Sequence, residues 1–571
     1  MQKGIRMKFK KGQALPFGIK VGDGGVNVSY PYAGGETCTL LLYNHGEAEP
    51  FKKYKMHRDS LSGTVCSGYL EGVQAASLEY NFEVGKKVVV DPYARAIAGK
   101  EAWGNEKNPQ KHEVRARIIA DDFEWEGDKP LNLAYHEIIA YSLHVRGFTM
   151  QASSKVRHKG TFHALMEKLP YLTDLGINQI QCMPVYEFEE CGMYKNYWGY
   201  GPAFYFAPKA SYAASADAVQ ECKQLVKACH KAGIEVVLDM PFSEGTPQPL
   251  MEECLRYYRT EYHIDGFILN PYIARIEVIK TDPFLAGVKV MEKCEAFQNV
   301  MRRFLKGDEG MIKEVMFRLK KHSEKDGVFN YITNHVGFTL CDLVSYDAKH
   351  NEANGEYNQD GPEYNYSWNC GAEGPTRKKN VIALRRKQMR NAFFLLLTAQ
   401  GTPCILAGDE FANSQKGNNN VYCQDNETGW VDWKRYKKET ELHGYVKELI
   451  AFRKAHPAIH AEKELMGMDK TSSGIPDISY HGENAWQVPE EISSRQLGIY
   501  YSGSQVEEEA CFVAYNMHWV DHRFALPALK KERKWYQVMS SEEGVYTAAK
   551  LLEDQKTVEL SERSTAIFIG R

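Results

Sequence analysis

HIDGFILN, residues 263–270, is a short apolar run that follows the amphipathic stretch MEECLRYYRTEYH at 251–263. The same order occurs directly before it, where VQECKQLVKACHKAG at 219–233 precedes IEVVLDM at 234–240. Short apolar strands that alternate with amphipathic helices imply parallel strands joined by crossover helices. This part of the chain therefore predicts a parallel sheet covered by helices.

The same alternation extends in both directions. It begins near Tyr135 with IIAYSLHV at 138–145 and ends near residue 410 with TPCILAGDEF at 402–411. About eight strand and helix units fit between these limits. We therefore expect an α/β chain with a (β/α)8 TIM barrel at its centre.

The flanking segments have a different pattern. Short alternating runs such as GVNVSY at 25–30 and CTLLLY at 38–43 precede the barrel, and ACFVAYN at 510–516 and TAIFIG at 565–570 follow the helix expected at 439–456. Alternating short strands separated by turns are typical of β-sandwiches. The predicted domains are an N-terminal β-sandwich at 1–130, the barrel at 131–460 and a C-terminal β-sandwich at 461–571.

Composition excludes several classes of function. The formal net charge is −3 and the basic residues are spread along the chain, so no nucleic-acid partner is expected. The 13 cysteines have no regular spacing and are expected to be reduced thiols rather than disulfides or metal ligands. We expect no cofactor, no metal site, no secretory signal and no membrane anchor, which predicts a cytoplasmic protein. The 34 tyrosines suit stacking on sugar rings, although a large core also uses tyrosine.

In a TIM barrel the active site lies at the carboxyl ends of the strands. The segments expected there resemble the signature regions of the α-amylase superfamily of glycoside hydrolases, in its isoamylase, pullulanase and glycogen-debranching branch. This resemblance implies α-glucans with α-1,6 branches as the ancestral substrate and a carbohydrate-module-like N-terminal sandwich, but a fold does not by itself give an activity. The segments that carry it are HVRGFT at 144–149, NYWGYGPAFYFAP at 196–208, LDMPFSE at 238–244, GFILN at 266–270, TNHVGFTL at 333–340, KHNEANGE at 349–356, SWNCGAEGPT at 367–376, the stretch 406–433, and DPYARAI at 91–97.

The resemblance also implies that the nucleophile has been lost. The family reads GFRFD on its fourth strand, whereas this chain reads GFILN. Asn270 thus occupies the nucleophile position and Ile268 that of an arginine that would orient it. An uncharged amide supplies neither an attacking electron pair nor a negative charge for an oxocarbenium ion.

Three further departures follow from the same comparison. TDPFLAG at 281–287 stands for the family's AEPWDAG, which predicts Asp282 at the general acid position, one methylene shorter than glutamate. Val336 follows His335 where the family has an aspartate, the third carboxylate. In LDMPFSE the Asp239 persists, but Ser243 and Glu244 replace an asparagine and a sugar-binding histidine, and the following loop is shorter.

Six positions are candidate substrate contacts: Tyr197, Trp198, Asp239, Glu244, Ile268 and His335. Four of them have a structural alternative, since the two aromatic residues and the histidine could pack in the barrel top and Asp239 could hold a strand end. Asp409 and Glu410, in AGDEF, match a family segment that is structural rather than catalytic.

Three functions remain open. The first is a glucan-binding or regulatory protein that has lost hydrolysis, and the second is an active α-1,6-debranching hydrolase with Glu244 or Asp282 in new roles. The third is an interaction subunit of an active isoamylase-like enzyme, for which the segment 417–433 and the helix after it would form the partner surface. An α-glucan is the expected ligand in the first two.

Overall fold

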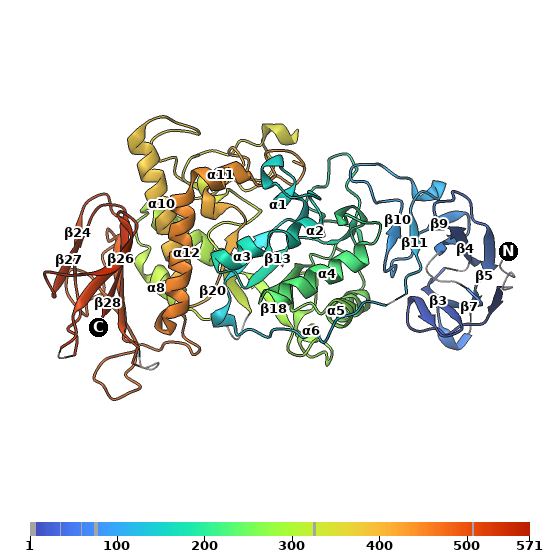
Figure 1. The fold of residues 1–571 in the computed structure, drawn as a ribbon, viewed down its shortest axis with the longest axis horizontal. Helices are drawn as coiled ribbons and strands as arrows, with labels where there is room; N and C mark the ends of the chain where they lie inside the picture. Colours follow the sequence, from blue (N-terminus) through green and yellow to red (C-terminus); the bar gives the residue numbers. More distant parts are fainter. Residues whose placement is uncertain are drawn as a thin grey trace.

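The computed structural model describes residues 7–34, 36–58, 60–73, 78–120, 122–323, 327–504, 508–530 and 532–571. The molecule is elongated, with two sheets at its N-terminal end, a barrel in the middle and a β-sandwich at its C-terminal end (Figure 1). Within the described residues no helix is long and apolar enough to cross a membrane.

A closed barrel of parallel strands forms the centre of the molecule, and this confirms the predicted fold class. Each strand is short and buried, as expected for strands covered by helices on the outside. The strands, in their order around the barrel, are β12 (Ala140–Leu143), β13 (Gln179–Cys182), β16 (Glu235–Asp239), β17 (Gly266–Ile268), β18 (Lys289–Lys293), β19 (Val328–Asn330) and β20 (Thr402–Leu406).

One strand fewer than expected closes the barrel within the described residues. Strand β18 pairs directly with β19, Glu292 lying opposite Val328. The connection between them carries two helices, α7 (Glu295–Lys306) and α8 (Ile312–Lys320), and its described part contains no strand. Helix α7 begins only two residues after β18 ends, which leaves no room for a further strand between them.

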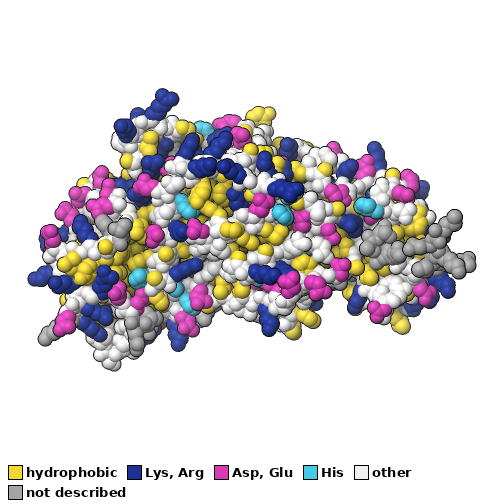
Figure 2. Space-filling view, viewed as in Figure 1, with side chains coloured by type: hydrophobic (Ala, Val, Ile, Leu, Met, Phe, Trp, Pro, Cys, Tyr) yellow, Lys and Arg dark blue, Asp and Glu magenta, His cyan; other side chains and the backbone are white. Residues whose placement is uncertain are grey.

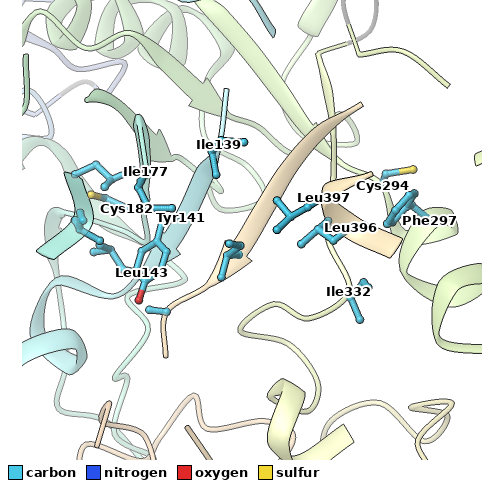
Figure 3. Close-up of a cluster of buried hydrophobic side chains, with 14 of the residues drawn as sticks. Ile139, Tyr141, Leu143, Ile177, Cys182, Cys294, Phe297, Ile332, Leu396 and Leu397 are labelled. Carbon is cyan, nitrogen blue, oxygen red and sulfur yellow. The ribbon is translucent and has the colours of Figure 1, made fainter. Parts of the chain in front are cut away.

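Alternation along the strands separates two apolar layers. Ile138 and Ala140 point into the barrel, where they pack with Ile268 and Met291. Ile139, Tyr141 and Leu143, the intervening residues of the same segment, pack outward among the helices (Figure 3). The covering helices include α2 (Phe162–Met166), α3 (Leu169–Leu175), α4 (Ala218–Lys231), α5 (Gln248–Tyr262), α10 (Lys379–Leu397) and α12 (Thr440–Ala455).

The N-terminal region forms two packed antiparallel sheets. One has the order β1-β7-β3-β2 and the other β10-β11-β8-β4-β5. Side chains from both sheets share one apolar cluster that includes Val28, Leu40 and Phe82. The strands are β1 (Lys8–Lys10), β2 (Gly18–Gly22), β3 (Gly25–Pro31), β4 (Cys38–Asn44), β5 (Lys52–Lys55), β7 (Val65–Glu71), β8 (Leu78–Val84), β10 (Ile97–Ala98) and β11 (Arg115–Arg117).

The C-terminal region is a six-stranded antiparallel sheet covered by a two-stranded one. Buried polar contacts fix it to the barrel: Arg390 of α10 donates to the carbonyl of Ser541 at 3.0 Å, and Asn391 donates to that of Arg563 at 2.8 Å. The strands are β21 (Ile478–His481), β22 (Gln496–Tyr501), β23 (Ala510–Asn516), β24 (His522–Ala525), β25 (Trp535–Ser540), β26 (Gly544–Leu551), β27 (Thr557–Leu560) and β28 (Ser564–Gly570).

Candidate functional site

The pairing of β17 with β18 determines which residues meet at the mouth of the barrel. Ile268 is the register partner of Met291, and both point into the barrel core. Because side chains alternate along a strand, the inward positions two residues further on are Asn270 and Lys293. Neighbouring strands lie about 4.8 Å apart, so these two positions are adjacent at the carboxyl end of the barrel. They carry an amide and an ammonium group.

Asp239, the last residue of β16, is the carboxylate of this mouth. Its Oδ2 lies 3.6 Å from Nζ of Lys293 and accepts a hydrogen bond of 3.0 Å from the hydroxyl of Tyr200. Because the Asp239 carboxylate is buried, leaving its charge without a partner would be costly, and Lys293 and Tyr200 both stabilise it. Asp239 is thus an engaged structural group in this arrangement.

His335 completes the network. Its Nε2 lies 2.6 Å from the Tyr200 hydroxyl, and the ring packs edge-on against Trp198. Burial, with smaller effects from Lys293 and His144, lowers the pKa of His335 well below its usual range, so the imidazole is neutral. Because the Tyr200 proton goes to Asp239, Nε2 of His335 donates and its buried Nδ1, which has no hydrogen-bond partner, remains an acceptor.

Asn270 is occupied by its own turn. Its Oδ1 accepts a hydrogen bond of 2.9 Å from the backbone N–H of Tyr272, and its carbonyl accepts from Ile273 and Ala274. An asparagine side chain that bonds the backbone two residues on stabilises such a turn. Two residues earlier, Ile268 is 6% exposed and lies in the barrel core, so it is a packing residue.

Val336 lies in the loop that follows β19. Its side chain is 38% exposed, and its backbone N–H donates to Oδ1 of Asn334 at 2.7 Å. Position 336, at which the sequence predicts the family's third carboxylate, therefore carries an exposed apolar side chain.

Asp282 does not reach the mouth, and its predicted place at the end of the fifth strand was wrong. It lies in the turn after α6 (Ile276–Lys280), seven positions before β18 begins. Its Oδ2 accepts from Nε of Arg256 on α5 at 2.6 Å, and its Oδ1 accepts from the N–H of Phe284. This ion pair lowers the pKa of Asp282 against the opposing effect of burial. Lys293 is the residue that the fifth strand presents to the mouth.

The aromatic pair lies inside the structure. Tyr197 and Trp198 are 1% and 6% exposed and belong to one apolar cluster with Met183 and Val421. The Tyr197 hydroxyl donates to the carbonyl of Gly429 at 3.2 Å. These contacts favour the packing alternative. Glu244, in contrast, is exposed in the turn between β16 and α5.

A small cavity of about 50 Å³, which we call the mouth cavity, lies beside this network, but Asn270, Lys293, Asp239 and Val336 do not line it. Small-molecule sites generally enclose about 300–1,000 Å³. Trp198 and His335 form part of its wall, as do Asn413 and Gln415 from the loop after β20. Within the described residues no group of three or more His, Cys, Asp or Glu side chains could hold a metal ion.

Three exposed tyrosines lie in two loops that contact Tyr422, a residue that packs against Trp198. Tyr357 and Tyr364 are 90% and 84% exposed in the loop 349–366, and Tyr194 is 44% exposed in the neighbouring loop. The Tyr194 ring lies 6.5 Å from that of Tyr422, whose hydroxyl donates to Glu356. We call Tyr194, Tyr357 and Tyr364 the rim tyrosines.

Part of the segment 417–433, a candidate partner surface under the third hypothesis, is buried. Asn418, Asn419 and Trp433 are less than 5% exposed, and the amides bond to neighbouring loops. Asp409 and Glu410 are also buried, away from the mouth cavity. Glu410 accepts hydrogen bonds from Tyr141 and Tyr171, and Asp409 from Thr333 and Leu340.

Sequence reasoning missed Lys293 and Tyr200. A usable signal was present for Lys293, because the alternating run VKVMEK at 288–293 is a better strand than TDPFLAG at 281–287. Tyr200 lies inside the quoted segment NYWGYGPAFYFAP but was not singled out; it reaches the mouth from the loop between β14 (Tyr186–Phe188) and β15 (Ala203–Pro208).

Comparison with known proteins agrees with this architecture. Residues 144–244 match the family described as "Alpha amylase, catalytic domain". The fold is similar to that of a type I pullulanase from Bacillus subtilis crystallised with maltose, with a TM-score of 0.74 and 18% identity over 97% of this chain and 85% of the other.

Two relatives are similar over most of their length. Isoamylase 1 of Arabidopsis thaliana is 29% identical over 713 aligned positions, which cover 99% of this chain and 88% of the relative. A glycogen debranching enzyme of Erwinia tasmaniensis is 31% identical over 574 positions, covering 80% of this chain and 86% of the relative. The chain therefore belongs to the α-amylase family of glycoside hydrolases, in the branch of isoamylases, pullulanases and glycogen debranching enzymes.

Proposed function

We propose that this protein is an α-glucan-binding member of the debranching branch that no longer hydrolyses glycosidic bonds. The observation that carries the proposal is the set of side chains at the mouth. The family resemblance for Asn270 and Val336, and the β17–β18 register for Lys293, support the inference that these side chains replace the carboxylates that hydrolysis would need.

Retaining hydrolysis needs a nucleophile and an acid about 5–5.5 Å apart. That separation matches the spacing of neighbouring strands, so a carboxylate at position 270 would find its acid at the end of β18. Lys293 is there instead. A fixed ammonium group also repels the positive charge of an oxocarbenium ion, so the site is electrostatically opposed to the transition state.

Asp239 and Glu244 do not form a substitute pair. Asp239 is held by Lys293 and Tyr200, and its register partner is Ile268, one inward position below Asn270. Glu244 is exposed in a turn.

Family membership and the rim tyrosines support glucan binding. The relatives are named isoamylase and glycogen debranching enzyme, and the similar pullulanase was crystallised with maltose. Exposed aromatic rings offer rigid contact area at low entropic cost. We propose that the glucan lies across the rim tyrosines rather than within the mouth cavity.

Active α-1,6 hydrolysis is the second candidate, because the similar proteins are named as debranching enzymes. It would require Asp239 and Glu244 to act as the carboxylate pair. Replacing each by Ala separately distinguishes the two candidates: a hydrolytic pair predicts that both variants lose any reducing-end release from pullulan.

Affinity electrophoresis of the full chain in glycogen gels tests the binding part of the proposal. We expect migration to slow as the glycogen concentration rises, with bovine serum albumin as the unretarded control. Equal migration of both proteins at every concentration would refute glucan binding while leaving the question of hydrolysis separate.

A further inference from the structure

A second cavity lies beside the mouth, where α9 (Leu340–Leu343), α10 and α11 (Trp433–Lys438) meet; its volume is about 220 Å³. One segment, residues 412–415, borders both cavities. Asn413 and Gln415 line the mouth cavity, whereas Ala412 and Ser414 line the second one. This segment therefore forms a shared wall.

Three guanidinium groups line this second cavity, which we call the arginine cavity. Arg385 and Arg386 come from α10, and Arg435 comes from α11. On α10 they share one helical face with Ile382 and Met389, at spacings of three and four residues. In the view of Figure 2, Lys and Arg side chains gather over the part of the molecule where α10 and α11 lie in Figure 1.

Arg385 supplies charge but is otherwise occupied. Its guanidinium donates to the backbone carbonyls of Gly374 at 2.8 Å, Asn369 at 3.0 Å and Ser345 at 3.4 Å. Because these acceptors are neutral, the bonds hold the group in place without cancelling its charge.

Arg386 and Arg435 are less committed. Arg386 makes one ion pair of 3.3 Å with Glu439, in which its side chain is 44% exposed. Arg435 reaches the carbonyl of Ala412 and the sulfur of Cys341, and no carboxylate within the described residues pairs with it. Both guanidinium groups can therefore donate hydrogen bonds to an additional anionic partner.

The second carboxylate in the cavity wall is already bonded. Oδ1 of Asp342 accepts from the Ser414 hydroxyl at 2.6 Å, and Oδ2 accepts from the Gln415 N–H at 2.7 Å. Three guanidinium groups thus face two carboxylates, those of Asp342 and Glu439, of which only Glu439 forms an ion pair with a cavity arginine. The cavity has an excess of positive charge.

The volume and lining of the arginine cavity limit which ligands can bind there. A volume of 220 Å³ lies below the range of about 300–1,000 Å³ for drug-sized ligands, so only a compact molecule fits. Tyr346, Ile382 and Met389 give the cavity an apolar wall against which a small ring can pack. Guanidinium forks match phosphate and carboxylate groups.

We propose that the arginine cavity binds a compact anion of monosaccharide size, a sugar phosphate or a sugar acid, whose charged group is received by Arg386 and Arg435. The site is distinct from the mouth and does not depend on glucan binding. The arginine cavity lies next to the mouth cavity, because residues 412–415 line both.

Isothermal titration of the full chain tests this proposal with glucose 6-phosphate, glucuronate and neutral glucose as probes. We expect at least one of the two anions to bind, and glucose to bind about tenfold more weakly or not at all, since a charge-assisted hydrogen bond is lost. The relative affinities of the two anions show which charged group the cavity prefers. Failure of both anions to bind at millimolar concentration, or equal binding of glucose, would overturn the proposal.

Matched variants locate the binding. Arg435→Gln is expected to weaken anion binding about tenfold, whereas Lys437→Gln, at an exposed position of the same helix, leaves it within about twofold. Equal weakening by both would show a nonspecific surface effect and overturn the assignment. If circular dichroism shows that Arg435→Gln does not fold, Arg386→Gln carries the same expectation.

Discussion

Lys293 and Asp239 are held together on the two strands that flank β17, with the lysine Nζ 3.6 Å from the carboxylate Oδ2. This contact fills the space beside Asn270 with an ion pair. A catalytic mouth would instead concentrate negative charge there to stabilise an oxocarbenium ion. The ion pair therefore belongs to a barrel top that is stabilised as a packed structure.

Reversing the charge of Lys293 is expected to destabilise the fold. In Lys293→Glu, two carboxylates would face each other at the mouth, so the free energy of unfolding should fall by about 1 kcal/mol or more. Lys293→Gln, the control, should change it by less than about 1 kcal/mol, because the lysine is partly exposed. Urea unfolding followed by circular dichroism measures both. Equal stability of the two variants would show that the ion pair is unimportant.

The buried carboxyls next to the barrel predict a dependence of stability on pH. Burial raises the pKa of Asp409 to about 7 and that of Glu410 to about 7. Carboxyls with raised pKa values stabilise the fold below their unfolded pKa, about 4, and this contribution is lost as the pH rises through 7.

Glu410→Gln tests that prediction, because the amide keeps the shape but cannot ionise. Ionisation of this pair lowers the stability of the parent protein between pH 4.5 and 7, and we expect the decrease from this source to be about half as large in the variant. Thermal unfolding in buffers across that range measures the slope. A slope unchanged from that of the parent protein would contradict the assignment.

Arg453 of α12 is expected to be a major determinant of stability. It is 1% exposed and donates to the carbonyls of Leu397, Ala399 and Gly401 at 2.6–3.0 Å. Arg453→Met would leave these carbonyls unsatisfied and should cost about 3 kcal/mol or more. The control is Lys447→Met, at another position of α12. It removes an exposed ion pair with Asp174 of α3 and should cost less than about 1 kcal/mol. Equal losses in guanidinium chloride unfolding would contradict this account.

Glucan binding is expected to depend on the rim tyrosines rather than on the buried aromatic pair. Tyr357→Ala and Tyr364→Ala should reduce retardation in glycogen gels, because each removes an exposed ring. Trp198→Phe should leave retardation unchanged while lowering thermal stability, since Trp198 packs against His335 and Tyr422. The opposite result would place the sugar in the mouth cavity.

The sequence predicted the barrel because strands and helices alternate over a long stretch, a pattern that local periodicity records. It did not predict that β18 would pair directly with β19, because strand pairing joins residues far apart in the chain. The position of Asp282 was misjudged for the same reason. TDPFLAG resembles the family motif locally, but the register with β17 selects Lys293 as the residue at the mouth.

The assignment of Asn270, Ile268 and Val336 to catalytic positions rests on the long motifs that contain them and stays a prediction. The small size of the mouth cavity could not be inferred, since it arises from loops after several strands that meet only in the fold. The arginine cavity was hidden for the same reason: Arg386 and Arg435 are 49 positions apart and come together through the packing around α10 and α11.

The most direct test of the central claim is the release of reducing ends from amylopectin and pullulan by the purified protein, beside an active isoamylase as positive control. The account predicts no release above the level of buffer at any enzyme concentration, because Asn270 and Lys293 supply neither nucleophile nor acid. Release that grows with protein concentration and disappears in Asp239→Ala would contradict it.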